Sequence, residues 1–130
     1  MPKHILVVDD EVPLLRALLV RLRIAGYEVD LASCGADGLA GAAQRPDVIL
    51  LDIRMPDIDG FEVNRRLKAD PRTSEIPVIF LSANVQDSAR QAAISAGAYA
   101  FLTKPYDSKT LLAAVESAVG LNGETAHAAT

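Results

Sequence analysis

The sequence predicts one doubly wound α/β domain, a (βα)5 chain whose five strands form a parallel sheet. Its 130 residues match the commonest size of a single compact domain. Short continuous apolar runs rich in Val, Ile and Leu are typical of strands that are buried on both faces of a sheet. These runs alternate with segments of helical periodicity, which favours right-handed crossovers with helices on both faces of the sheet.

Five segments are the predicted strands. Four of them are continuous apolar runs, and the second is a weaker segment in which apolar and polar residues alternate. The predicted strands are residues 5–8, 27–32, 48–51, 78–81 and 99–102.

The predicted helices lie between and after these strands. In the first, leucines recur at intervals of three and four residues from Leu14 to Leu22, and the helix should end at Gly26. The others are residues 36–44, 60–68, 87–96 and 109–119. The last two should end at Gly97 and Gly120, because glycine adopts the left-handed conformation of a helix C-cap at little cost. We expect a domain at residues 1–121 and a flexible tail or linker stub at 122–130.

Composition and charge exclude several classes of protein. A net charge of −4 and a pI near 5.1 argue against a nucleic-acid-binding surface, which needs clustered Lys and Arg. Cys34 is the single cysteine, so it has no internal disulfide partner, and the first apolar run is too short for a secretory signal. No apolar run approaches the roughly 20 residues of a membrane span. We therefore expect a cytoplasmic protein that binds neither nucleic acid nor a membrane directly.

Chemically active residues follow several of the predicted strands. Asp9 and Asp10 follow the first strand, Asp52 the third, Ser82 the fourth and Lys104 the fifth. In open α/β sheets ligands bind beyond the carboxyl ends of the strands, so these side chains should meet at one edge. Two carboxylates ~4 Å apart repel each other by on the order of 4 kcal/mol, and a counter-charge is needed. Mg²⁺ prefers such oxygen ligands, and the lysine ammonium can supply further positive charge.

The same set of residues predicts phosphoryl-transfer chemistry. A carboxylate beside a cation can attack phosphorus and form an aspartyl phosphate. Asp52 is the best candidate nucleophile, because it follows the central strand at residues 48–51, where rigid backbone fixes its direction. A metal ion and a lysine can stabilise the anionic transition state, and a hydroxyl such as that of Ser82 can bind a phosphoryl oxygen.

Simpler interpretations exist for each of these residues. Asp9, Asp10 and Glu11 could cap the helix that begins near Pro13, since carboxylates favour helix N-termini. Taken singly, Ser82 is more typical of a turn and Lys104 of a solvated charge. The acids at 57 and 59, followed by Gly60, invite comparison with a calcium-binding loop, but a Met and an Arg occupy the first and last ligand positions. We interpret these two acids as a cap for the helix that begins at residue 60.

Four blocks of sequence carry a family resemblance. VVDDE at 7–11, LLDIRMPDIDGFE at 50–62, PVIFLSA at 77–83 and FLTKP at 101–105 resemble the receiver domains of two-component response regulators. The resemblance covers roughly residues 3–119. It implies a flavodoxin-like, CheY-like fold with strand order 2-1-3-4-5.

The resemblance also implies roles for individual residues. Asp9, Asp10, Asp52 and the backbone carbonyl of Arg54 are implied as ligands of Mg²⁺, for which Mn²⁺ can substitute, and Asp52 is implied as the phosphoacceptor.

A second group of implied roles concerns the response to phosphorylation. Ser82 and Phe101 correspond to the switch hydroxyl and the switch aromatic of the family. Lys104 corresponds to its lysine, and the Lys104–Pro105 peptide bond is implied to be cis.

By this resemblance the chain is a signalling domain and not a classical enzyme. A sensor histidine kinase or a histidine phosphotransfer protein donates the phosphoryl group. The fourth helix, fifth strand and fifth helix, at residues 86–96 and 99–119, then change as a surface that binds a protein target, an output domain or a second copy of the chain. One alternative is a haloacid-dehalogenase-like phosphatase, although Arg54 occupies the place of its second Asp. The other is a receiver-fold interaction module that works without phosphorylation.

Overall fold

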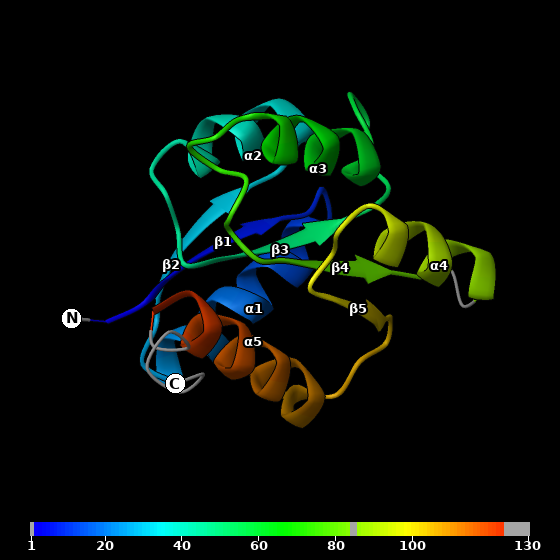
Figure 1. Ribbon diagram of the computed structural model, residues 1–130. Coiled ribbons are helices and arrows are strands. Elements are labelled where there is room, and N and C mark those ends of the chain that lie inside the picture. Colours follow the sequence, from blue (N-terminus) through cyan, green and yellow to red (C-terminus); the bar gives the residue numbers. More distant parts are fainter. Residues whose placement is uncertain (1, 84–85, 124–130) are drawn as a thin grey trace.

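The predicted α/β architecture is confirmed by the computed structural model, which describes residues 2–83 and 86–123. Five parallel strands form one sheet in the order β2-β1-β3-β4-β5 (Figure 1). The strands are β1 His4–Val8, β2 Glu28–Ala32, β3 Val48–Asp52, β4 Val78–Ser82 and β5 Ala100–Thr103. The helices are α1 Val12–Ile24, α2 Gly35–Ala42, α3 Gly60–Ala69, α4 Asp87–Ser95 and α5 Ser108–Gly123. Within the described ranges, no helix is both long and apolar enough to span a bilayer.

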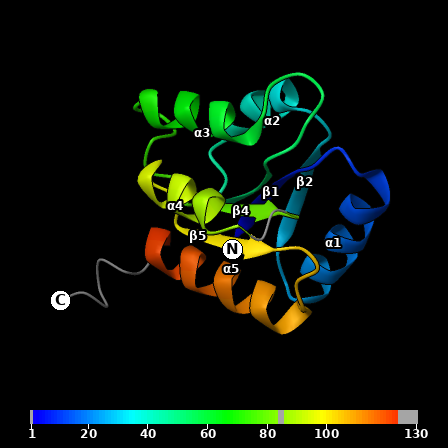
Figure 2. The ribbon, with the colours of Figure 1, turned by 90° about the vertical axis from the view of Figure 1, so that its right-hand side faces the viewer.

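Helices cover both faces of the sheet, and each face has its own apolar core. Figure 2 shows α2 and α3 on one side of the sheet and α1 and α5 on the other. The strand residues alternate between the two cores, so that Ile5 faces α1 and α5 while Leu6 faces α2 and α3. Helix α4 packs on the α2–α3 face through Ala93. Burial on both faces explains why β1, β3 and β4 appear in the sequence as continuous apolar runs.

Two of the three predicted glycine helix ends are confirmed, and one is wrong. Gly26 and Gly97 follow α1 and α4 with φ angles of 99° and 85°, which is the left-handed region that favours glycine. Gly120, in contrast, lies inside α5, which continues to Gly123. A glycine in a helix is tolerated at a cost of about 1 kcal/mol, so its presence alone does not end the helix. Residues 124–130 of the expected tail lie outside the described residues.

The predicted cap of α3 is correct for one acid and wrong for the other. Asp59 is the N-cap of α3, where its carboxylate accepts a hydrogen bond of 2.9 Å from the Glu62 backbone N–H. Asp57 instead accepts hydrogen bonds from the backbone N–H groups of Gly35 and Ala36 at the start of α2. It therefore caps a different helix from the one that its sequence position suggested.

Gly60 permits a close approach between α3 and the end of β3. Its N–H donates to the Ile53 carbonyl at 2.8 Å. A Cβ atom at this position would lie 2.4 Å from the carbonyl oxygen of Asp52 and 2.9 Å from Cα of Ile53. Any side chain at residue 60 would therefore press on the backbone of Asp52.

We predict that Gly60→Ala lowers the free energy of unfolding by about 2 kcal/mol, because the new methyl group overlaps backbone that cannot move away cheaply. The matched control is Gly120→Ala, where a Cβ meets nothing within 4 Å. It should raise stability by roughly 0.5–1 kcal/mol, since alanine is the better helix former. Urea unfolding of both variants measures the difference, and equal stabilities would contradict the proposed close contact.

Candidate functional site

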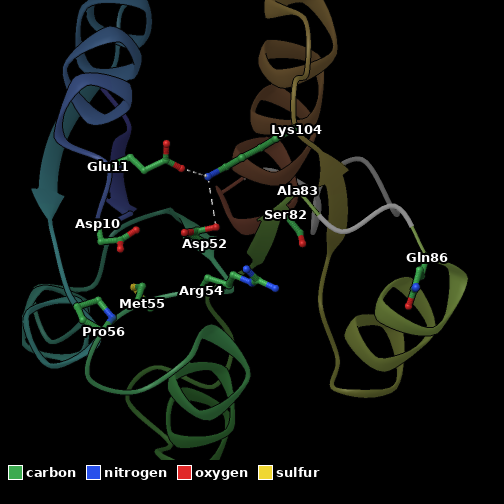
Figure 3. Close-up of a pocket in the computed structure, with 10 residues that line it drawn as sticks. All are labelled: Asp10, Glu11, Asp52, Arg54, Met55, Pro56, Ser82, Ala83, Gln86 and Lys104. Atoms are coloured by element: carbon green, nitrogen blue, oxygen red, sulfur yellow. Dashed lines mark hydrogen bonds and ion pairs between the residues drawn. The ribbon is translucent and has the colours of Figure 1, made fainter.

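The parallel sheet brings the predicted site residues to its carboxyl edge. Asp52 and Ser82 are the last residues of the neighbouring strands β3 and β4. Asp9 follows β1, and Lys104 follows β5. Figure 3 shows the side chain of Lys104 reaching toward the carboxylate of Asp52. The ends of four strands thus supply one site, as the sequence predicted.

Lys104 is the centre of the charge network in this site. Its Nζ atom lies 3.0 Å from Oδ2 of Asp9, 3.1 Å from Oε1 of Glu11 and 3.3 Å from Oδ1 of Asp52. The Asp9 side chain is fully buried, while that of Glu11 is 63% exposed. The second oxygen of Asp9 accepts a 2.9 Å hydrogen bond from the Glu11 backbone N–H. Sequence reasoning missed the contact between Glu11 and Lys104, although the position of Glu11 beside the acids was a usable signal.

Burial and neighbouring charges shift the pKa values of both central groups. The pKa of Asp52 is raised from 3.8 to about 6, mainly by burial and then by the charge of Asp9, with Lys104 acting in the opposite direction. Burial lowers the pKa of the Lys104 ammonium. Its hydrogen bond to Asp9 and the charges of Asp52 and Asp9 outweigh this effect, so its pKa lies above the ordinary value. Burial and the charge of Asp9 therefore hold the pKa of Asp52 above its ordinary value although the ammonium of Lys104 lies beside it.

The donor set fits a hard divalent cation. Asp9, Asp10 and Asp52 each offer a carboxylate oxygen, and these oxygens all lie within 4.8 Å of one another. Mg²⁺ is commonly held by one or two carboxylates while it keeps several waters. The simpler interpretation of the acids as caps of α1 lacks support, because the N-cap residue is Glu11 and its side chain makes no capping hydrogen bond.

An open pocket of about 740 Å³ lies over the carboxylates of Asp10 and Asp52. Of the predicted site residues, Asp10, Asp52, Arg54, Ser82 and Lys104 line it (Figure 3). Its remaining lining residues are Glu11, Met55, Pro56, Ala83 and Gln86. The side chain of Asp52 therefore borders an open pocket.

Phe101 lies outside the wall of this pocket. The residue is 8% exposed and packs in the core that faces α2, α3 and α4. The guanidinium carbon of Arg90, on α4, lies 5.1 Å from the centre of the ring, which is a cation–π contact. This contact could not be predicted from the sequence, since it depends on how α4 packs against β5. The Lys104–Pro105 peptide bond is cis, as the resemblance implied.

The fold and the acid–lysine pocket are those of a receiver domain, and comparison with known proteins gives the same family. The response regulator receiver domain family model matches residues 5–116, so the chain belongs to this family. It is a receiver domain of two-component response regulators. Such domains are signalling domains that bind Mg²⁺ at an acidic pocket and work with histidine kinases and output domains.

Similar proteins include both long and short regulators. The chain is 41% identical to the DNA-binding regulator RpaA of a Synechocystis strain, over 90% of this chain and 48% of that protein. It is 40% identical to protein PilH of Pseudomonas aeruginosa, over 88% of this chain and 95% of that protein. The chain thus spans about half the length of RpaA and nearly all of PilH.

A solved structure gives the same fold with a metal ion. The receiver domain of the sensor histidine kinase PA1611 from Pseudomonas aeruginosa superposes with a TM-score of 0.85 and 30% sequence identity. The match covers 92% of this chain and 99% of that one. In that structure a magnesium ion is coordinated in the active-site cleft.

The raised pKa of Asp52 predicts a pH-dependent gain in stability for Asp52→Asn without divalent cations. Between pH 3.8 and about 6 the folded protein holds a proton that the unfolded chain releases, so wild-type stability falls as pH rises through this window. The Asn variant does not titrate there. It should be more stable than wild type by about 2 kcal/mol above pH 7, and by far less below pH 4.

Chemical unfolding in EDTA at pH 4 and pH 8 measures this difference. Asp37→Asn, a change at an exposed acid in the first turn of α2, is the matched control and should alter stability little at either pH. If wild type is more stable than Asp52→Asn at pH 8, the claim that burial of the Asp52 charge is unfavourable is wrong.

Proposed function

We propose that the chain is a phosphorylation switch in which Asp52 accepts a phosphoryl group from a histidine kinase or a histidine phosphotransfer protein. One observation carries this proposal. The carboxylate of Asp52 lies at the end of a central strand, beside two further acids and 3.3 Å from the ammonium of Lys104. An attacking oxygen, oxygen ligands for a cation and a fixed positive charge therefore lie together, which is what phosphoryl transfer requires.

We further propose that Asp9, Asp10, Asp52 and the backbone carbonyl of Arg54 hold Mg²⁺, with Mn²⁺ as a substitute. The cluster of three carboxylate oxygens supports the first three ligands, and the position of Arg54 in the pocket wall is compatible with the fourth. When bound, the cation supplies charge neutralisation to the carboxylates and to the phosphoryl oxygens.

The residues of the chain then have separate tasks. An oxygen of Asp52 forms the new bond to phosphorus as the bond between phosphorus and the donor histidine nitrogen breaks. Lys104, whose side chain is only 15% exposed, can bind a phosphoryl oxygen through the ammonium that now faces three carboxylates. The Ser82 hydroxyl, one strand away from Asp52, can donate to another phosphoryl oxygen. The donor imidazole leaves with a proton from solvent.

The output of the switch is a change of the α4-β5-α5 surface. We propose that movement of Ser82 toward the phosphoryl group allows a rearrangement of Phe101, and that the Arg90 contact transmits this change to α4. A target protein, an output domain or a second copy of the chain would bind the altered surface. The cytoplasmic location expected from the sequence stays a prediction.

Neither alternative function has a specific observation in its favour. In the phosphatase alternative a second Asp is needed two residues after the nucleophile, and Arg54 lines the pocket at that place. An interaction module that works without phosphorylation would not need the cluster of three carboxylate oxygens. Phosphoryl labelling distinguishes this module from the proposed switch.

Labelling with a small phosphodonor tests the proposal. With labelled acetyl phosphate and Mg²⁺, wild type and the control Asp37→Asn should each take up about one phosphoryl group per chain, and Asp52→Asn should take up almost none. EDTA should abolish uptake by wild type, because the carboxylates then repel the anionic donor. A phosphate-affinity gel gives the readout.

Two results would overturn the proposal. Equal labelling of wild type and Asp52→Asn would reject Asp52 as the acceptor. A wild type that stays unlabelled with Mg²⁺ present would favour the module that works without phosphorylation.

A further inference from the structure

The loop at residues 53–59, the connecting loop, joins the acceptor strand to α3 and forms one wall of the pocket. Its residues Arg54, Met55 and Pro56 line the pocket (Figure 3). Under the function proposed above, its Arg54 carbonyl also binds the metal. The place of this loop relative to Asp52 therefore affects the metal site directly.

Backbone contacts fix the two ends of the connecting loop. The Ile53 N–H donates to the Leu81 carbonyl of β4 at 3.3 Å, and the Gly60 N–H donates to the Ile53 carbonyl at 2.8 Å. These bonds set where the loop begins and ends. These two bonds do not hold the middle of the loop, where Met55 and Pro56 line the pocket.

Asp57 ties the middle of the loop to α2. Its Oδ1 atom accepts from the Gly35 N–H and its Oδ2 atom from the Ala36 N–H, both at 2.9 Å. The N-cap residue of α2, Cys34, makes no side-chain capping hydrogen bond, so Asp57, which lies 22 positions after Gly35, performs this task. The backbone hydrogen bonds from Ala36 and Gly35 lower the pKa of Asp57 to about 2, which keeps the carboxylate charged at neutral pH.

A second contact joins the loop to α2 at the same place. A Cβ atom on Gly35 would lie 2.3 Å from Cγ1 of Ile58 and 3.0 Å from the Ile58 carbonyl oxygen. Only glycine at residue 35 allows the loop to approach α2 this closely. Two neighbouring loop residues thus contact the start of α2, Asp57 through hydrogen bonds and Ile58 through packing, and together they hold the loop in place.

We infer that Asp57 is a positioning residue of the metal site, which holds the connecting loop against the N-terminus of α2 so that the Arg54 carbonyl can serve as a ligand. Asp57 itself does not touch the metal or the phosphoryl group. Its loss releases the middle of the loop and weakens Mg²⁺ binding, while Asp9, Asp10 and Asp52 stay in place on their strands. Partners that orient a ligand without touching the metal commonly change metal affinity by 10–100-fold.

The test is a Mg²⁺ titration of the full chain, read as the rise of the thermal unfolding midpoint with Mg²⁺ concentration. Relative to wild type, Asp57→Ala should raise the Mg²⁺ dissociation constant about tenfold. Asp57→Asn keeps an acceptor oxygen but no charge, so its constant should rise by about threefold, as a partial rescue. The rate of labelling by acetyl phosphate at saturating Mg²⁺ should stay within about twofold of wild type in both variants, since the reacting groups are intact.

Asp70→Ala is the matched control for a general loss of stability. The Asp70 carboxylate likewise accepts a 2.9 Å backbone hydrogen bond, from Arg72, but it lies after the C-terminal end of α3, away from the pocket. Its Mg²⁺ dissociation constant should equal that of wild type even where its midpoint without metal is lower. Gly35→Ala disturbs the same loop from the helix side through Ile58 and should weaken Mg²⁺ binding as Asp57→Ala does.

Each outcome bears on one claim. If wild type shows no midpoint shift with Mg²⁺, the proposed metal site fails. If wild type binds Mg²⁺ and Asp57→Ala binds it equally well, the positioning role is overturned and the proposed function stands. If Asp57→Ala does not fold, Gly35→Ala decides, and a wild-type dissociation constant for that variant would overturn the inference.

Discussion

Three carboxylates compete for the single ammonium of Lys104 at the carboxyl edge of the sheet. Asp9 and Asp52 are buried there, and Glu11 reaches the same nitrogen from a more exposed position. Taking charges out of water is costly unless they are paired, and here the pairing is incomplete. Burial contributes most to the raised pKa of Asp52, and the negative charge of Asp9 adds to it. A bound cation, and later a phosphoryl group that engages Lys104, would each change the balance, so the same imbalance supports both the metal site and the switch.

The fold maintains this unfavourable arrangement because the acids are attached to its most rigid parts. β1, β3 and β4 are buried on both faces, and their side chains interlock with two separate apolar cores. Asp9 and Asp52 follow or end two of these strands and cannot separate without unpairing the sheet. The connecting loop, in contrast, depends on a few specific contacts, of which the bonds of Asp57 and the bare backbone of Gly35 and Gly60 are the clearest. The site therefore combines a rigid set of acids with one wall whose position depends on individual side chains.

Sequence reasoning predicted the features that depend on local pattern and failed where distant segments meet. The strands were recognisable because burial on both faces leaves continuous apolar runs, and the acids followed from where those strands end. Gly120 misled because a glycine permits the end of a helix without requiring it, and α5 continues. Asp57 was assigned to the wrong helix, since its partners at Gly35 and Ala36 are close only after folding. The contact of Arg90 with the Phe101 ring was missed for the same reason, because the two residues meet only after folding. The cis peptide bond before Pro105 was expected from the family resemblance alone.

The most direct measurement of the charge imbalance is a pH titration of the Asp52 carboxyl carbon by NMR, assigned by its disappearance in Asp52→Asn. Without divalent cations the carboxyl should titrate with a pKa of about 6. With saturating Mg²⁺ its pKa should fall well below that value, because the cation favours the charged form. An ordinary aspartate pKa in both conditions, or a raised pKa that Mg²⁺ leaves unchanged, would contradict a site in which a cation stabilises the buried carboxylate of Asp52.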